Sequence, residues 1–166
     1  NFGIIYGVSA FGLSNQSNMS RSESKSMIDS YFDAYPTLKK YISDQINFAR
    51  ENGFVETILG RRRYLKDINA RNPVVRGAAE RNAVNAPIQG SAADIIKLAM
   101  INISKKMKSN EFKSNMLIQV HDELIFEIHN SEIELMRKLI TEEMENAYAL
   151  KVPLSVDIGI GDNWFD

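Results

Sequence analysis

Apolar positions recur at helical spacing through most of the first half of the chain. Ser20 and Glu23 fit a capping box, and apolar side chains then repeat every three or four residues as far as Tyr35. Pro36 suits the first turn of a second helix, which Asn52-Gly53 should end. The pattern therefore predicts two consecutive helices.

Two short β-rich runs, residues 54–58 and 63–65, follow these helices and predict a pair of strands. Asn72-Pro73 then has the residues expected at the start of another helix. Pro87 should end or kink that helix, because its ring clashes with the carbonyl four residues earlier. A further helical stretch is expected over residues 91–108.

The second half of the chain begins with a different pattern. Apolar runs at residues 116–118 and 124–126, separated by polar residues, predict a β-hairpin. Residues 131–134 fit a second capping box, Pro153 breaks the helix that follows, and residues 154–160 are expected to form a last strand. The whole pattern predicts an α+β fold with an antiparallel sheet.

Composition limits the chemistry that the chain can carry. The 166 residues are 44% hydrophobic and 25% charged, which is ordinary for a globular domain. The chain has no cysteine, which excludes disulfides and thiolate metal sites. No apolar stretch approaches the roughly 20 residues that span a bilayer. Because the sequence opens at Asn1 within an apolar pattern, we expect a fragment of a longer protein.

Charge is unevenly distributed, although the net charge is only −1. Residues 60–81 contain seven basic and two acidic residues, a local charge of +5, whereas residues 122–149 contain two basic and eight acidic residues, a local charge of −6. A basic half can neutralise phosphates. Taken alone, however, such charge runs are more typical of solvated helix faces.

The predicted hairpin places His121, Asp122 and Glu123 at its tip. Unpaired carboxylates at such a tip face water or a cation, and a hard cation such as Mg²⁺ prefers oxygen ligands. A solvated turn is an equally good interpretation of this short motif. The sequence has no Ser/His/Asp pattern and no His-x-x-x-His spacing, so a metal-dependent or triad hydrolase is poorly supported.

Arg81, Asn85 and Gln89 recur every four residues and would form one polar stripe on a helix. These side chains contact base edges and phosphates with fixed donor and acceptor geometry. The neighbouring residues are small, which allows close approach to another backbone. A tightly packed helix pair with one polar edge explains the same pattern, and we prefer it when the stripe is taken alone.

Aromatic and basic residues offer further candidates near the N-terminus. Phe2 and Tyr6 are four residues apart and could present faces for base stacking, although core packing is the simpler explanation for Phe2. The cluster Arg61-Arg62-Arg63 could contact phosphates, but an isolated cluster of this kind is more often a solvated loop.

Four motifs in one order are more specific than any of them alone. They are Asn1-Phe2-Gly3-Ile4-Ile5-Tyr6-Gly7, Gly60-Arg61-Arg62-Arg63-Tyr64, Arg81 to Gly90, and Val120-His121-Asp122-Glu123. The set closely resembles the C-terminal end of a family A DNA polymerase, of the bacterial DNA polymerase I type, over essentially the whole chain. The resemblance implies an incomplete right-hand polymerase, with residues 1–90 as a mostly helical fingers remainder and residues 91–166 as the C-terminal part of the palm.

The resemblance also implies which residues contact the substrates. Phe2 would contact the sugar of the incoming deoxynucleoside triphosphate, and Tyr6 would stack beside the templating base. Arg81, Asn85 and Gln89 would contact the primer–template DNA near the nascent base pair. No firm contact is assigned to the basic cluster.

The catalytic roles implied by the resemblance fall on the predicted hairpin tip. His121 would lie near the primer terminus, Asp122 would bind metal and Glu123 would support it. The parent would transfer nucleotides to the primer 3′-hydroxyl with two Mg²⁺ per active site. The family's second metal-binding aspartate, and its triphosphate-binding arginine and lysine, have no counterpart in this sequence.

We therefore expect a DNA-directed DNA polymerase whose isolated C-terminal fragment is inactive. The alternative is a non-catalytic DNA-binding module that keeps the polymerase fold. The resemblance places the parent in the bacterial cytoplasm, at the nucleoid, without a membrane partner. An exposed sheet edge in the fragment would favour self-association.

Overall fold

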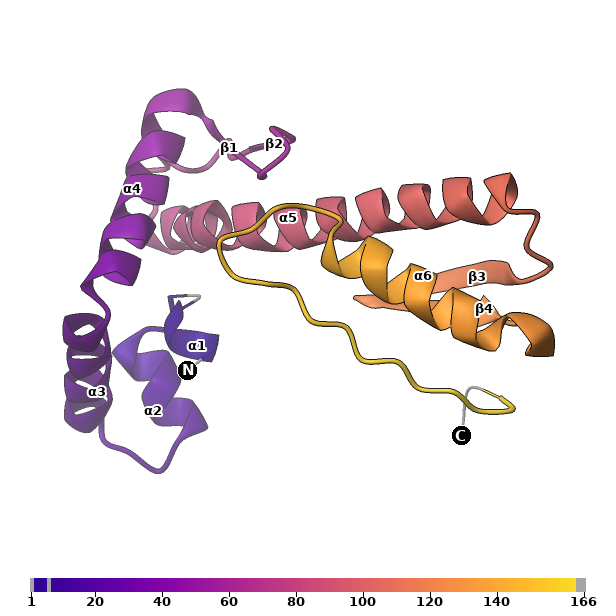
Figure 1. The fold of residues 1–166 in the computed structure, drawn as a ribbon. Coiled ribbons are helices and arrows are strands. Elements are labelled where there is room, and N and C mark those ends of the chain that lie inside the picture. Colours follow the sequence, from indigo (N-terminus) through magenta and orange to yellow (C-terminus); the bar gives the residue numbers. More distant parts are fainter. Residues whose placement is uncertain (1, 6, 164–166) are drawn as a thin grey trace. The chain divides into compact units, whose positions relative to one another are not determined.

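The computed structural model describes residues 2–5 and 7–163, with only the backbone of Phe2. Helices and two small antiparallel sheets make up this part of the chain (Figure 1), which confirms the α+β prediction. Residues up to Ser91 pack as one unit and residues from Ala92 onward as another. No helix in these ranges is long and apolar enough to cross a membrane.

The first unit is mostly helical, as its apolar spacing predicts. Its elements are α1 (Phe2–Ile5), α2 (Ala10–Gln16), α3 (Arg21–Ala34), α4 (Pro36–Asn52), β1 (Phe54–Glu56), β2 (Arg62–Tyr64) and the first part of α5 (Pro73–Ser109). The capping box of α3 is confirmed, because the Glu23 amide donates to Ser20 Oγ over 3.2 Å and the Ser20 amide donates to Glu23 Oε2 over 2.7 Å. Gly53 ends α4 with a φ of 77°, a conformation that favours glycine.

The core of the first unit joins α4, the strand pair and α5. It contains Ala49, Val55, Leu65, Ile68, Ala79, Ala83 and Ala86. The three alanines come from α5 and lie on one face because they are spaced by three or four residues. Small side chains on that face let the neighbouring backbone approach the helix closely.

Pro87 neither ends α5 nor divides it, which corrects the prediction of two separate helices. The helix is continuous from Pro73 to Ser109. A proline inside a helix removes one hydrogen bond, at a cost of about 3 kcal/mol. Buried residues on both sides of it, Ala86 before and Ile96 after, anchor the helix by packing, so that the loss of one backbone bond is tolerated. Sequence periodicity alone does not reveal this compensation.

The second unit consists of the rest of α5, the hairpin β3 (Asn115–Val120) and β4 (Glu123–Glu127), the short turn η1 (Asn130–Glu132) and α6 (Ile133–Glu145). The predicted hairpin is confirmed, with Val120 opposite Glu123 at its tip. Ile103 and Met107 of α5 pack on Met136 and Ile140 of α6. Met116, Leu124 and Phe126 add one face of the hairpin to this core.

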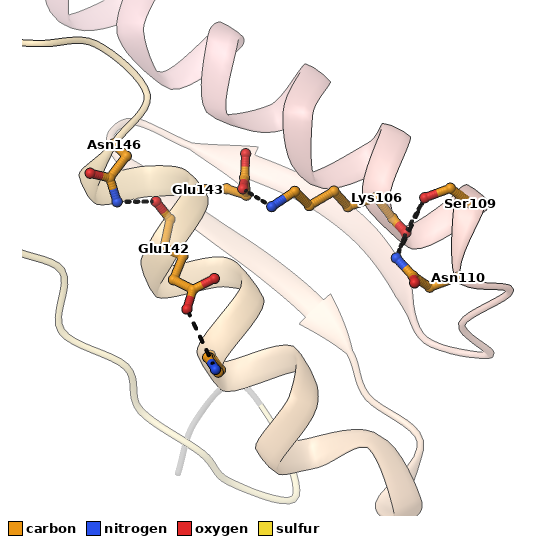
Figure 2. A network of polar contacts seen from close by, with 7 residues as sticks. Lys106, Ser109, Asn110, Glu142, Glu143 and Asn146 are labelled. Carbon is orange, nitrogen blue, oxygen red and sulfur yellow. Dashed lines mark hydrogen bonds and ion pairs between the residues drawn. The ribbon is translucent and has the colours of Figure 1, made fainter.

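Polar contacts at the ends of the helices complete the second unit, and Figure 2 shows how they lie. Lys106 of α5 forms an ion pair with Glu143 of α6. The Lys106 carbonyl also accepts hydrogen bonds from the Ser109 hydroxyl and from Asn110 Nδ2, at the point where α5 ends. Asn146 Nδ2 donates in the same way to the Glu142 carbonyl at the end of α6. These side-chain bonds add to the backbone bonds that the Asn110 and Asn146 amides donate to the same two carbonyls.

The predicted capping box at residues 131–134 is wrong. Helix α6 begins at Ile133, one residue later than that motif requires, and no side chain caps it at Glu132. Glu132 instead accepts hydrogen bonds from the amides of Lys113 and Ser114 and from the Ser114 hydroxyl, the last over 2.6 Å. The His129 amide donates to the same hydroxyl. The Glu132 carboxylate thus connects the start of β3 to the start of α6. Local sequence spacing does not predict this contact, because the residues that it joins are far apart in the chain.

The predicted last strand, residues 154–160, is also wrong as a strand. The segment is irregular, although Leu154, Val156 and Ile158 are half-buried and alternate with exposed residues. Ile158 packs on the second core, and the Val156 amide donates to Glu145 Oε1. A strand requires a neighbouring backbone with which to pair, and no strand in the described ranges lies beside this segment.

The Glu132 contacts predict a dependence of stability on pH. They hold the pKa of Glu132 below its ordinary value of 4.5, chiefly through the Lys113 amide and next through the Ser114 hydroxyl. The carboxylate therefore stabilises the fold above pH 4.5, and this contribution is lost as the pH falls through the folded-state pKa. We expect Glu132→Gln to lower the Tm at pH 7, with a difference from wild type that shrinks below that pKa.

Thermal unfolding between pH 7 and pH 3 checks this prediction. Glu134→Gln is the control, because Glu134 is exposed in the first turn of α6 and accepts no hydrogen bond from a described residue. Its effect should be small. A Glu132→Gln difference that stays constant over the whole pH range would contradict the account.

Candidate nucleic-acid interface and carboxylate turn

The carboxylate turn (His121, Asp122 and Glu123) lies at the tip of the β3–β4 hairpin, and all three residues are exposed. His121 has a φ of 54°, in the left-handed region that non-glycine residues rarely adopt. Gln119 Nε2 donates to the His121 carbonyl over 2.8 Å and so supports this backbone. A strained residue between two paired strands fixes the point at which the carboxylates leave the sheet.

The carboxylate turn supplies only part of a metal site. Its donors are carboxylate oxygens, the ligands that Mg²⁺ prefers, and their exposure leaves room for water and a substrate. Within residues 2–5 and 7–163, however, no group of three or more histidine, aspartate or glutamate side chains is placed to hold a metal ion. The donor set fits Mg²⁺ chemically, but any further protein ligand must come from elsewhere.

The polar row (Arg81, Asn85 and Gln89) lies on α5, as its spacing predicts. Arg81 and Gln89 are exposed and Asn85 is half-buried. Asn85 Oδ1 is buried and has no hydrogen-bond partner among the described residues. An unsatisfied buried acceptor costs about 1–3 kcal/mol and calls for an explanation, such as a partner that binds there.

The first residue of the polar row packs against the segment that follows α1. A Cβ built on Gly7 would lie 3.3 Å from Arg81 Cγ, and Gly7 has a φ of 82°. Glycine is needed at this position both for its backbone conformation and for the contact. A pocket of about 180 Å³ lies at this junction, lined by Ile5, Gly7, Ile42, Ile46, Arg81 and Val84 among others. The structure therefore brings the N-terminal motif and the polar row together.

The structure does not describe the side chains of the two aromatic residues that are predicted to contact the substrates. Tyr6 lies outside the described residues, and of Phe2 the structure gives only the backbone, within α1. Gly7, the last residue of the same sequence motif, is described beside Arg81. The polar row belongs to the first unit and the carboxylate turn to the second.

The basic cluster has partners within the first unit. Arg62 forms an ion pair with Glu56 over 2.7 Å and lies 4.3 Å from the centre of the Phe54 ring. Arg61 Nη2 donates to the Gly90 carbonyl over 3.0 Å. Two of the three arginines are therefore partly committed to internal contacts, which reduces the charge available for phosphates.

The β1–β2 turn (Thr57–Arg61) contacts α5, which local sequence patterns do not predict. The Ile58 amide donates to Ser91 Oγ over 2.8 Å, beside the bond from Arg61 to Gly90. A glycine in a helix interior usually has a packing reason, so Gly90 was the available signal. The partner could not be identified, because it lies about thirty residues earlier in the chain.

Comparison with known proteins places the chain in a family. The family model for DNA polymerase family A matches residues 1–166. The chain belongs to DNA polymerase family A.

Individual relatives agree with this placement. The chain is 50% identical to a DNA polymerase I of Caldicellulosiruptor bescii and 48% identical to one of Bacillus subtilis, in each case over all 166 residues. It spans about one fifth of the length of these curated relatives, 20% and 19% respectively. It is also similar to a solved structure of the POL domain of Pol1 from M. smegmatis in complex with DNA primer-template and dNTP. The TM-score is 0.95 and the identity 48%, over 98% of this chain and 29% of that one.

The left-handed backbone of His121 predicts an unusual response to glycine. We expect His121→Gly to be more stable than His121→Ala by about 1 kcal/mol, because only glycine adopts a positive φ without steric cost. Chemical denaturation of the two variants measures the difference.

Arg137 provides the matched control, because it is exposed in the middle of α6. There the order should reverse, with Arg137→Gly less stable than Arg137→Ala by about 1 kcal/mol. Equal stability of the two His121 variants would mean that the turn carries no strain.

Proposed function

We propose that the chain is the C-terminal part of a DNA-directed DNA polymerase, the remainder of the fingers followed by part of the palm. Its parent transfers nucleotides from deoxynucleoside triphosphates to the 3′-hydroxyl of a primer. The observation that carries the proposal is the pair of exposed carboxylates, Asp122 and Glu123, at a turn whose backbone is held in a strained conformation at His121. Membership of DNA polymerase family A supports it.

The polar row contacts primer and template in this proposal. Arg81 and Gln89 are exposed on α5 and are therefore accessible to a partner, and Asn85 is half-buried between them. The buried Oδ1 of Asn85 accepts a hydrogen bond from the nucleic acid and thereby gains the partner that it lacks in the described chain. Arginine, asparagine and glutamine suit such contacts because their donors and acceptors have fixed geometry.

The N-terminal motif contacts the incoming nucleotide and the templating base. The approach of Gly7 to Arg81 supports this assignment, because Gly7 belongs to the same sequence motif as Phe2 and Tyr6. We assign Phe2 to the sugar of the deoxynucleoside triphosphate and Tyr6 to stacking beside the template. The M. smegmatis structure to which the chain is similar is a complex with primer-template and dNTP, which supports these substrates for the parent.

At the carboxylate turn, Asp122 binds Mg²⁺, Glu123 supports it and His121 lies near the primer terminus. Bound Mg²⁺ would lower the pKa of the primer 3′-hydroxyl and neutralise charge on the triphosphate. Asp122 and Glu123 contribute negative charge at a fixed, water-accessible position, and His121 fixes the backbone that presents them. No group of three or more potential metal ligands converges within the described residues, so we assign the further carboxylate of a two-metal site to another part of the parent. We assign the parent to the bacterial nucleoid, where its DNA substrate lies, and its similarity to bacterial DNA polymerase I proteins supports this assignment.

A non-catalytic DNA-binding module remains the second candidate, because the described carboxylates do not by themselves form a complete metal site. A hydrolase has no comparable support, since no further ligand converges on Asp122 in the described ranges. The two remaining candidates differ in whether Asp122 is needed for chemistry.

Substitution of Asp122 in the full-length parent separates these candidates. Asp122→Ala should lower primer extension by about a thousandfold or more, since metal-held charge is worth several kcal/mol in the transition state. Affinity for the primer–template should stay close to wild type. Single-turnover extension and fluorescence anisotropy with a labelled duplex measure the two quantities.

Asp33→Asn is the matched control, because Asp33 is an exposed carboxylate on α3 in the other unit. It should leave extension and binding unchanged. Extension that survives in Asp122→Ala would favour the binding module, and an equal loss of binding and extension would argue against a metal role for Asp122.

The incomplete metal site gives a further prediction for the isolated chain. Residues 1–166 alone should not extend a primer at any Mg²⁺ concentration, because the described part offers too few carboxylates to hold a metal pair. An Asp122→Ala chain purified in the same way is the control for contaminating polymerase. Extension by the unsubstituted chain that this control does not show would contradict the prediction.

A further inference from the structure

We propose that the β1–β2 turn positions Gln89 by packing on α5 one residue away from it, an inference that rests on the proposed function. The bonds concerned are those from the Ile58 amide to Ser91 Oγ and from Arg61 Nη2 to the Gly90 carbonyl. Gln89 itself is exposed on the adjoining position of the helix. The turn therefore contacts the backbone that carries Gln89 and leaves the Gln89 side chain accessible.

The turn is well defined by its own hydrogen bonds. The Gly60 amide donates to the Thr57 carbonyl and the Thr57 amide to the Arg61 carbonyl, each over 2.9 Å. The Arg61 amide donates to Thr57 Oγ1 over 3.1 Å, and Gly60 has a φ of 78°. A turn with this many internal bonds is a stiff support. The strands that it joins pack on α4 and α5 through Val55 in the first core.

The helix needs such support at this position. Pro87 cannot donate a backbone hydrogen bond to the carbonyl four residues earlier. Ser91 Oγ donates to the Pro87 carbonyl over 2.5 Å, a side-chain bond that bends helices. Backbone hydrogen bonds therefore constrain the turn of α5 that carries Gln89 less than they constrain the other turns of this helix. The contacts from Ile58 and Arg61 supply the missing constraint.

Gly90 allows the close approach. A Cβ built on Gly90 would lie 2.5 Å from Thr57 Cγ2 and 3.4 Å from Arg61 Nη2. Real Cβ atoms essentially never approach another atom this closely, so alanine at position 90 forces the Thr57 side chain or the turn that carries it to shift. Helix propensity alone would favour alanine over glycine here. The glycine thus has a packing role, and the atom that it accommodates is the Thr57 methyl group.

Substitutions in the full-length parent test the proposal through the dissociation constant for a primer–template duplex. Gly90→Ala should weaken binding about tenfold, the loss expected when one well-placed amide contact is misaligned. Adding Thr57→Ser to this variant removes the clashing methyl group but keeps the hydroxyl that Arg61 uses, and should restore binding. Thr57→Ser alone should bind like wild type.

A double-mutant cycle separates positioning of Gln89 from general destabilisation. In a Gln89→Ala background, Gly90→Ala should weaken binding by less than about twofold, because the contact that it misaligns is already absent. Gly159→Ala is the matched control, since a Cβ built on Gly159 meets nothing within 4 Å. If Gly90→Ala does not fold, Ser91→Ala replaces it, because this variant removes only the hydroxyl between Ile58 and Pro87.

The outcomes are decisive. Wild-type affinity in both Gly90→Ala and Ser91→Ala overturns the inference and leaves the proposed function intact. A loss that Thr57→Ser does not restore, or a loss of equal size in the Gln89→Ala background, overturns it as well. A wild-type parent that does not bind the duplex overturns the proposed function and the inference together.

Discussion

Helix α5 is the element on which the rest of the structure depends. It is continuous over 37 residues, and its period fixes which side chains are buried and which face outward. Its alanines enter the first core, and Ile103 and Met107 enter the second. The same period places Arg81, Asn85 and Gln89 in one row along the helix. Helix α5 thus contributes to the core of each unit and carries the polar row within the first.

The carboxylate turn follows from a different constraint, the cost of burying charge. Asp122 and Glu123 are exposed at the end of a hairpin, where water or a cation can solvate them. The hairpin itself is held by apolar contacts of Met116, Leu124 and Phe126, and the Glu132 carboxylate fixes its other end at Ser114. The apolar face and the polar clamp keep the tip in place, and the strained backbone at His121 determines where the acids leave the sheet.

Much of the fold was predictable from local signals, because those signals act over a few residues. The capping box at Ser20, the helix start at Pro36, the stop at Gly53 and the hairpin around His121 are all confirmed. Predictions failed where distant residues decide the structure. Packing keeps α5 intact through Pro87. The capping box predicted over residues 131–134 does not form, and Glu132 binds the distant Ser114 instead. Residues 154–160 keep the alternation of a strand but find no neighbour.

The candidate site, like the fold, was predictable from the sequence only where local spacing determines it. Spacing predicted the polar row and its single face, and the apolar runs predicted the position of the carboxylate turn. The contact of Gly7 with Arg81 and that of the β1–β2 turn with Gly90 join segments far apart in the sequence, so that only the structure reveals them. The unsatisfied Oδ1 of Asn85 is likewise invisible in the sequence, since asparagine is ordinarily solvated.

A crystal structure of the full-length parent with primer–template, deoxynucleoside triphosphate and Mn²⁺ tests the central claim most directly, because anomalous scattering locates the metal. The account predicts an Asp122 oxygen within about 2.0–2.3 Å of a metal ion, as a direct ligand, and a hydrogen bond from the nucleic acid to Asn85 Oδ1. A metal pair held without Asp122, or an Asp122 carboxylate that points away from the primer terminus, would contradict it.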